Sequence, residues 1–105
     1  MIRGGMVTLA VRDVASSVRF YIETLGLKLV EETAEASILD AGESFLIELR
    51  AGTPAQTQPL TLFPKVPLAE AISIYEMRGV SFADDGGFTD PDGNRLRLRA
   101  PIASA

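Results

Sequence analysis

The sequence predicts an α+β domain built from two successive copies of one unit, in which a strand is followed by a helix and then by further strands. In each half of the chain an alternating apolar segment, typical of a strand, precedes a segment with apolar residues at helical spacing. The predicted helices end at Gly26 and Gly79, which lie half a chain length apart, and an apolar residue begins a new strand after each glycine.

The first unit covers residues 1–50. It opens with the alternating strand 6–11, after which Asp13 can cap a helix because its carboxylate accepts hydrogen bonds from the free N–H groups of the first turn. A turn that contains Gly42 then leads into the last strand of the unit, residues 45–50. This order predicts a strand, a helix and further strands.

The second unit covers residues 60–105 and repeats this order. Pro67 suits the first turn of its helix, where a missing N–H group removes no hydrogen bond. Its last strand, residues 95–99, follows the run Asp90-Pro91-Asp92-Gly93-Asn94, whose proline and glycine favour a tight reversal. We therefore expect Asp90 and Asp92 to be turn residues rather than a metal site or a catalytic pair.

Residues 51–59 are predicted to be a linker, because one glycine and two prolines stand there among small polar residues. The linker is too short to separate independent domains. A chain of 105 residues is therefore expected to form a single domain, 1–105, with one core. Its elements should be about eight strands and two helices.

The composition excludes several kinds of chemistry. The chain has no histidine and no cysteine, so it has no imidazole base, no thiolate nucleophile and none of the usual zinc ligands except carboxylates. A net charge of −4 disfavours nucleic acid as a partner. No apolar run reaches the roughly 20 residues of a membrane span, so no membrane partner is expected. Nothing indicates an oxidising compartment, which predicts a cytoplasmic location.

Two stretches carry a resemblance to a known family: Val7-Thr8-Leu9-Ala10-Val11-Arg12-Asp13-Val14 with Ser17, Phe20-Tyr21 and Leu25-Gly26-Leu27, and Phe88-Thr89-Asp90-Pro91-Asp92-Gly93-Asn94. Together with the repeat, they resemble the vicinal oxygen chelate superfamily, which includes glyoxalase I, fosfomycin-resistance enzymes, extradiol dioxygenases and bleomycin-resistance proteins. The resemblance implies paired βαβββ modules that curl around a central cavity, usually completed by dimerisation, so we expect a homodimer. Residues 80–88 are few for two strands, which predicts a short or open wall in the second module.

The resemblance also implies where a metal would bind. Metal-binding members take a histidine from the start of each module's first strand and a glutamate or histidine from each last strand. At these positions the chain has Met6, Leu60 within one residue of alignment, Glu48 and Arg97. Only Glu48 could bind a divalent cation, and one carboxylate does not make a dedicated site. We therefore expect no metal, no cofactor and no metal-dependent glyoxalase or dioxygenase activity.

Glu48 and Arg97 occupy equivalent positions of the repeat, so both are predicted to face the cavity. Arg97 would replace the metal as the cation, either by pairing with Glu48 or by receiving an acidic or carbonyl group of a ligand. An ion pair that only holds the modules in register is an equal alternative. Arg95 and Arg99 are assigned to a solvated edge. Strand alternation predicts further ligand-binding residues: Met6, Thr8, Leu46 and Leu60. On the first strand of the second unit, either Leu60 and Leu62 or, in a register shifted by one residue, Thr61 and Phe63 would face the cavity.

Three functions are consistent with the sequence. The first is a metal-independent small-molecule-binding protein, similar to bleomycin-resistance members, that holds an antibiotic or another apolar or anionic ligand in a dimer crevice. The second is a metal-free lyase or isomerase with Glu48 as catalytic base and Arg97 as stabiliser of an enolate or oxyanion. A nearby cation lowers the pKa of a carboxyl and weakens it as a base, which favours binding over catalysis. The third is a structural or regulatory dimer whose cavity is filled.

Overall fold

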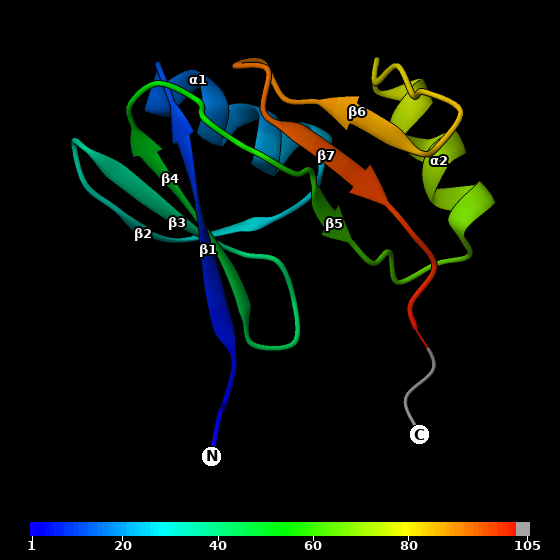
Figure 1. Cartoon of the computed structure of the whole chain (residues 1–105), viewed down its shortest axis with the longest axis horizontal. Helices are drawn as coiled ribbons and strands as arrows, with labels where there is room; N and C mark the ends of the chain where they lie inside the picture. The colour runs from blue at the N-terminus through cyan, green and yellow to red at the C-terminus, as the bar shows by residue number, and fades with distance from the viewer. Residues whose placement is uncertain (103–105) are drawn as a thin grey trace.

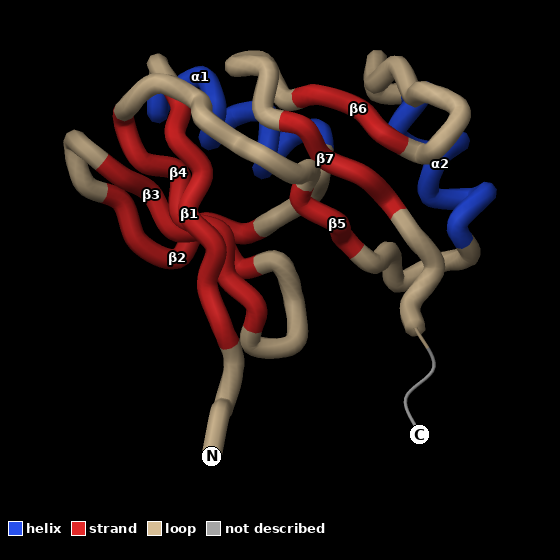
Figure 2. Tube along the Cα trace, in the orientation of Figure 1, coloured by secondary structure: helices blue, strands red, loops and turns tan. Residues whose placement is uncertain are grey.

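Strands form two sheets with helices packed behind them in the computed structural model, which describes residues 1–102 (Figures 1 and 2). The elements in chain order are β1 (Gly5–Val11), α1 (Val14–Arg19), the π-helical turn η1 (Phe20–Thr24), β2 (Lys28–Glu32), β3 (Ala36–Asp40), β4 (Phe45–Ala51), β5 (Leu60–Leu62), α2 (Leu68–Met77), β6 (Gly87–Thr89) and β7 (Arg95–Leu98). We call β1 to β4 the first module and β5 to β7 the second module.

The two sheets repeat one topology. The first sheet has the strand order β1-β4-β3-β2, and the second has the order β5-β7-β6. In both modules the first strand pairs in parallel with the last, and the last strand pairs antiparallel with the strand before it. This arrangement confirms the predicted α+β fold of paired modules.

The second module lacks a counterpart of β2. Residues 1–102 therefore contain seven strands rather than the predicted eight or so. Between α2 and β6 the chain turns tightly: the N–H of Ala83 donates to the carbonyl of Gly87 (2.8 Å), and the N–H of Gly86 donates to the carbonyl of Ala83 (3.0 Å). The segment is too short for both a strand and a turn, so the β6 edge of the second sheet has no fourth strand beside it.

The helix ends follow the sequence signals. The carboxylate of Asp13 accepts hydrogen bonds from the backbone N–H and the hydroxyl of Ser16, which hold the pKa of Asp13 below its usual value. Gly26 and Gly79 leave the two helical segments with φ angles of 83° and 94°, a conformation that favours glycine. Pro67 lies one residue before α2, not in its first turn as predicted. Among residues 1–102, no helix has the length and apolar character needed to cross a bilayer.

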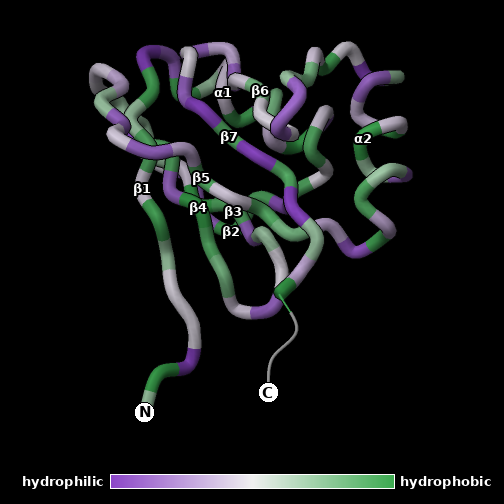
Figure 3. The backbone as a smooth tube through the Cα atoms, turned by 45° about the vertical axis from the view of Figure 1, so that its right-hand side comes forward, coloured by the Kyte–Doolittle hydropathy of each residue, from purple (hydrophilic) through white to green (hydrophobic). Residues whose placement is uncertain are grey.

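The core lies between the sheets and the helices. Alternate residues of the last strands supply it, and Ile47, Leu49, Leu96 and Leu98 are all buried. Tyr21 from η1 is fully buried against them. Figure 3 shows hydrophilic residues interrupting the hydrophobic ones along β7. The helices thus cover one face of each sheet, and the other face is available to form a site.

The turn at residues 90–94 joins the two modules. The carboxylate of Asp90, which is 4% exposed, accepts hydrogen bonds from the hydroxyl of Tyr21 (2.7 Å), from the N–H groups of Asp92 and Asn94 (both 2.9 Å) and from the side chain of Asn94 (3.1 Å). The Asn94 side chain also donates to the carbonyl of Ala10 at 2.8 Å. Asp90 and Asp92 are turn residues, as predicted, and the turn in addition fixes the second module to the first.

Replacing Tyr21 by phenylalanine is expected to lower the free energy of unfolding by about 1–2 kcal/mol, because Asp90 loses a donor in a buried place. Burial, with the negative charge of Asp90, raises the pKa of Tyr21 above its ordinary value of 10.0. The folded state thus favours the protonated phenol, so this stabilisation is complete below pH 10.0 and declines above it. Urea denaturation should show a difference between wild type and Tyr21→Phe that is constant to about pH 9 and shrinks above about pH 10. A difference that does not change with pH would contradict this assignment.

Candidate functional site

The open side of the first sheet carries four of the predicted lining residues. In the pairing of β1 with β4, Met6 is opposite Leu46 and Thr8 is opposite Glu48. Because side chains alternate along a strand, all four project away from the core residue Ile47 and from the helices. The structure therefore brings Met6, Thr8, Leu46 and Glu48 together on one surface.

Glu48 has its partners within the first module. The Thr8 hydroxyl donates to its Oε1 at 2.9 Å, and the Arg50 guanidinium bonds its Oε2 at 3.0 Å. These hydrogen bonds, that from Arg50 first, hold the pKa of Glu48 below its usual value, and the same contact raises the pKa of Arg50. Arg97 was predicted to pair either with Glu48 or with a ligand. In the structure Glu48 pairs instead with Arg50 on its own strand.

The second sheet corrects the position of Leu60. In the pairing of β5 with β7, Thr61 is opposite Arg97, whereas Leu60 is opposite the buried Leu96 and packs against the core. Leu60 therefore lies on the helix side of the sheet and is not a lining residue. The physical reason is the period of two along a strand, which sends neighbouring side chains to opposite faces.

The pairing register also fixes which residues of the modules correspond. Thr61 is the counterpart of Thr8, because each lies opposite the equivalent position of a last strand. Two residues earlier, Pro59 is then the counterpart of Met6. Pro59 lies within the one residue of alignment that the prediction of Leu60 allowed, and the strand has the register in which Thr61, not Leu60, shares the face of Arg97.

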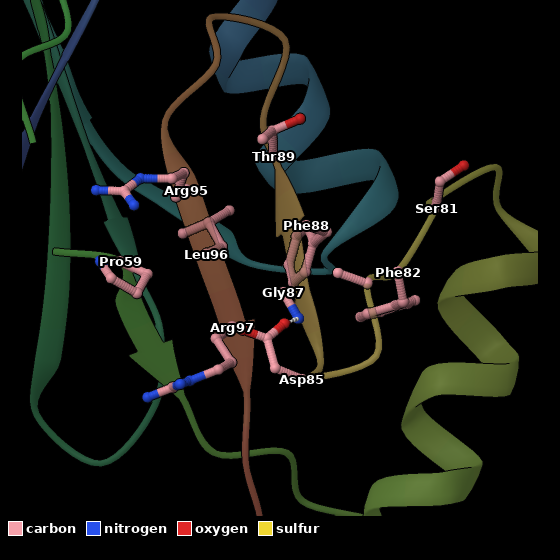
Figure 4. Close-up of a pocket in the computed structure, with 11 residues that line it drawn as sticks. Pro59, Ser81, Phe82, Asp85, Gly87, Phe88, Thr89, Arg95, Leu96 and Arg97 are labelled. Carbon is pink, nitrogen blue, oxygen red and sulfur yellow. Dashed lines mark hydrogen bonds between the residues drawn. The ribbon is translucent and has the colours of Figure 1, made fainter.

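An open pocket with a volume of about 430 Å³ lies over β6 and β7, where the missing strand leaves the sheet uncovered (Figure 4). Residues from four segments line it: Pro59 of the linker, residues before β6 that include Phe82 and Asp85, all three residues of β6, and Arg95 to Arg97 of β7. The pocket thus adjoins the position at which the family resemblance implies a metal ligand, and a cation stands there instead.

The two arginines of the pocket have unused hydrogen-bonding capacity. Nε of Arg97 is buried and has no hydrogen-bond partner among the described residues. Neither Arg95 nor Arg97 takes part in either of the ion pairs found within residues 1–102. In Figure 4 both guanidinium groups extend to the same side of β7, with Pro59 beside them. Because Arg97 lines the pocket and its guanidinium has no partner among the described residues, its terminal amino groups suit an acceptor supplied by a ligand.

The linker is attached to the pocket by Gln56. Its side-chain amide donates to the carbonyl of Arg95 at 3.1 Å and accepts a hydrogen bond from the N–H of the same residue. This pair of bonds imitates the pairing of a neighbouring strand. It holds the linker beside β7 and so places Pro59 in the wall of the pocket.

Sequence reasoning missed part of this site. Arg95 is exposed, as its assignment to a solvated edge expected, but it also lines the pocket, which that assignment did not include. Arg99 is exposed and does not line the pocket, as the solvated assignment expected. For Asp85 the only signal was the shortness of residues 80–88. Within residues 1–102 no three acidic side chains gather closely enough to hold a metal ion.

Several solved structures share this fold. The integron cassette protein HFX_CASS4, from the mobile metagenome of the Halifax Harbour sewage outfall, matches with a TM-score of 0.80 and 22% identity over 96% of this chain and 100% of that chain. TnmS3, an antibiotic-binding protein from Streptomyces sp. CB03234, matches with a TM-score of 0.75 and 22% identity over 97% and 98% of the two chains. A glyoxalase/bleomycin resistance protein/dioxygenase from Alicyclobacillus acidocaldarius matches with a TM-score of 0.72 and 15% identity over 90% and 88%.

The identities to these structures are low and show the fold alone. No curated protein sequence matches the chain. The family model of the Glyoxalase/Bleomycin resistance protein/Dioxygenase superfamily, however, matches residues 4–83, which is most of the chain. Together with the two sheets of matching topology, this match identifies the family. The chain belongs to the glyoxalase/bleomycin resistance protein/dioxygenase superfamily.

Proposed function

We propose that this protein binds a small molecule with an acidic group, without a metal, and that Arg97 receives that group. The observation that carries the proposal is the guanidinium of Arg97, which lines an open pocket and makes neither an ion pair nor a side-chain hydrogen bond among the described residues. The planar guanidinium suits bidentate contacts with a carboxylate or phosphate. Arg95, on the same face, adds a second positive charge, and the apolar lining matches the usual small-molecule pocket.

Metal independence is part of the proposal, because the chemistry of the residues does not fit a metal centre. Met6 and Pro59 stand where the resemblance implies histidines, and neither offers a ligand that a hard divalent cation accepts. The carboxylate of Glu48 is engaged by Arg50, and Arg97 would repel a cation in the second module. The proposed function therefore uses no metal.

Catalysis by Glu48 is the less well supported function. A general base that acts near neutral pH needs a raised carboxyl pKa, whereas the hydrogen bonds from Arg50 and Thr8 lower the pKa of Glu48. Glu48 forms its ion pair with Arg50 and not with Arg97, which was its proposed electrophilic companion. Binding is consistent with both observations.

A homodimer is included in the proposal. The pocket is open where the second module lacks a strand, and a second copy could complete its wall. The fold likeness to TnmS3, which is named as antibiotic-binding, supports antibiotics as one class of ligand to screen. Ligands with an acidic group are the first members of that class to test.

The first experiment is native mass spectrometry of gently purified protein, with metal analysis of the same sample. We expect a metal-free dimer that carries a small acidic adduct.

The second experiment measures binding of simple acids. The dimer is expected to bind 4-methylbenzoate or hexanoate in NMR titrations. Arg97→Gln should weaken binding about tenfold or more, because a charge-assisted hydrogen bond contributes about 1.5–3 kcal/mol.

Arg99→Gln is the matched control, because Arg99 is an exposed arginine that directly follows β7 and does not line the pocket. Its affinity for the probes should equal that of the wild type. Both variants should keep the wild-type amide spectrum, because neither arginine makes a side-chain hydrogen bond among the described residues. Stoichiometric bound metal, or equal affinities for Arg97→Gln and the wild type, would overturn the proposal.

A further inference from the structure

The pocket also contains a carboxylate without a cationic partner. Asp85 belongs to the turn before β6, and its Oδ1 accepts a hydrogen bond from the N–H of Gly87 at 2.9 Å. Asp85 is exposed and lines the pocket, and it is in neither ion pair of residues 1–102. The turn thus fixes one carboxylate oxygen and leaves the other, Oδ2, available.

Asp85 and Arg97 lie on the same face of the second sheet. Gly87 pairs with Arg97 across β6 and β7, so a side chain at position 87 would project to the Arg97 face. A Cβ placed on Gly87 would meet Oδ1 of Asp85 at 2.9 Å and Oδ2 at 3.8 Å. The carboxylate therefore occupies the space that the glycine leaves free. Figure 4 shows the Arg97 guanidinium extending away from Asp85 rather than toward it.

From this arrangement we infer that the ligand is amphoteric: it carries a protonated amine that binds Asp85 as well as the acidic group that binds Arg97. The inference rests on the proposed function and names the class of its ligand. Opposite charges stand at two places of one pocket without neutralising each other, and a ligand with both charges satisfies both. Phe82 and Pro59 supply apolar surface for a short hydrocarbon or aromatic body.

The charge of the whole protein supports this class. The net charge of −4 repels ligands whose own net charge is negative. An amino acid-like ligand has no net charge at neutral pH and avoids this repulsion, yet it still offers an acidic group to Arg97. A molecule that carries only one of the two groups makes only one of the two charged contacts, so it should bind more weakly.

The test compares three para-substituted benzene probes that differ in which charged groups they carry. These are 4-(aminomethyl)benzoate, which has both charges, 4-methylbenzoate, which has only the acid, and 4-methylbenzylamine, which has only the amine. The affinity of the purified full chain for each is measured by NMR titration. We expect 4-(aminomethyl)benzoate to bind about tenfold more tightly than either other probe, as one additional charge-assisted contact predicts.

Two carboxylate variants locate the effect. Asp85→Asn keeps an oxygen that can accept the Gly87 N–H, so the turn is retained, and it removes the charge. It should weaken 4-(aminomethyl)benzoate about tenfold and leave 4-methylbenzoate unchanged. Asp84→Asn is the matched control, because Asp84 is an exposed neighbour that does not line the pocket, and its affinities should equal those of the wild type.

The outcomes separate this inference from the proposed function. If 4-methylbenzoate binds in an Arg97-dependent way and Asp85→Asn does not change the affinity of 4-(aminomethyl)benzoate, the amphoteric ligand is wrong and the acid-binding function stands. If neither acid binds, or if Arg97→Gln binds both acids as well as the wild type does, the proposed function fails and this inference fails with it. A loss with Asp84→Asn equal to that with Asp85→Asn would also overturn the inference.

Discussion

Asp90→Ala is expected to lower the free energy of unfolding by about 3–5 kcal/mol, a large part of the roughly 5–15 kcal/mol that stabilises a domain. The substitution removes the acceptor of four hydrogen bonds at a place that is 4% exposed. It leaves the Tyr21 hydroxyl and the N–H groups of the turn without their partner. It also weakens the attachment of the second module to the first.

Urea denaturation followed by circular dichroism measures this effect. Asp84→Ala is the control, because Asp84 is an exposed carboxylate in another turn and its loss should change stability by no more than about 0.5 kcal/mol. Asp90→Asn keeps one acceptor oxygen and should fall between the wild type and Asp90→Ala. A loss below about 1 kcal/mol for Asp90→Ala would show that the turn does not hold the modules together.

Gly86→Ala is expected to lower the free energy of unfolding by about 3 kcal/mol, for two reasons that add. The φ angle of Gly86 is 83°, which strains any residue with a Cβ. An added Cβ would also lie 2.9 Å from the carbonyl oxygen of Leu98, a backbone atom that cannot turn aside. The N–H of Leu98 donates to the carbonyl of Gly86 at 3.2 Å, so a shift of this turn also disturbs β7.

Gly93→Ala separates the two reasons. Gly93 has a φ angle of 86°, but an added Cβ would meet no atom within 4 Å. We therefore expect Gly93→Ala to lose only the conformational part, about 1–2 kcal/mol, in the same denaturation experiment. Equal losses for both variants would mean that the close approach of Gly86 to Leu98 relaxes without cost.

Local signals in the sequence predicted the architecture. The cap at Asp13, the left-handed glycines at positions 26 and 79, and the turn at residues 90–94 each depend on one residue type in one backbone conformation. Such preferences act within a few residues and need no knowledge of the rest of the chain. The repeated order of these signals then predicted two equivalent sheets.

The register of pairing between distant strands was harder to predict than these local features. The choice between Leu60 and Thr61 depends on a register shift of one residue, and both alternatives place an acceptable residue in the core. Composition gave no means to choose. The partner of Glu48 was missed for a related reason, because Arg50 and Arg97 were both suitable cations and only the folded geometry distinguishes them.

The pocket exists because the second module lacks a counterpart of β2. The shortness of residues 80–88 indicated an open wall, but not which side chains would border it. Asp85 and Arg95 became pocket residues because a strand is missing beside β6 and because Gln56 holds the linker against β7. The bond between Gln56 and Arg95 joins segments that are far apart along the chain, so it does not follow from a local preference.

The hydrogen bond between Tyr21 and Asp90 has a consequence for how the protein is made. The two residues are 69 positions apart. A ribosome adds about 5–20 residues per second, so the Tyr21 hydroxyl exists for roughly 3–14 s before its acceptor has been synthesised. During this interval the first module exposes a polar group that its own half of the chain cannot satisfy. Although the architecture is duplicated, the two halves are not independent, because the first module reaches its full set of hydrogen bonds only after residue 90 has been synthesised.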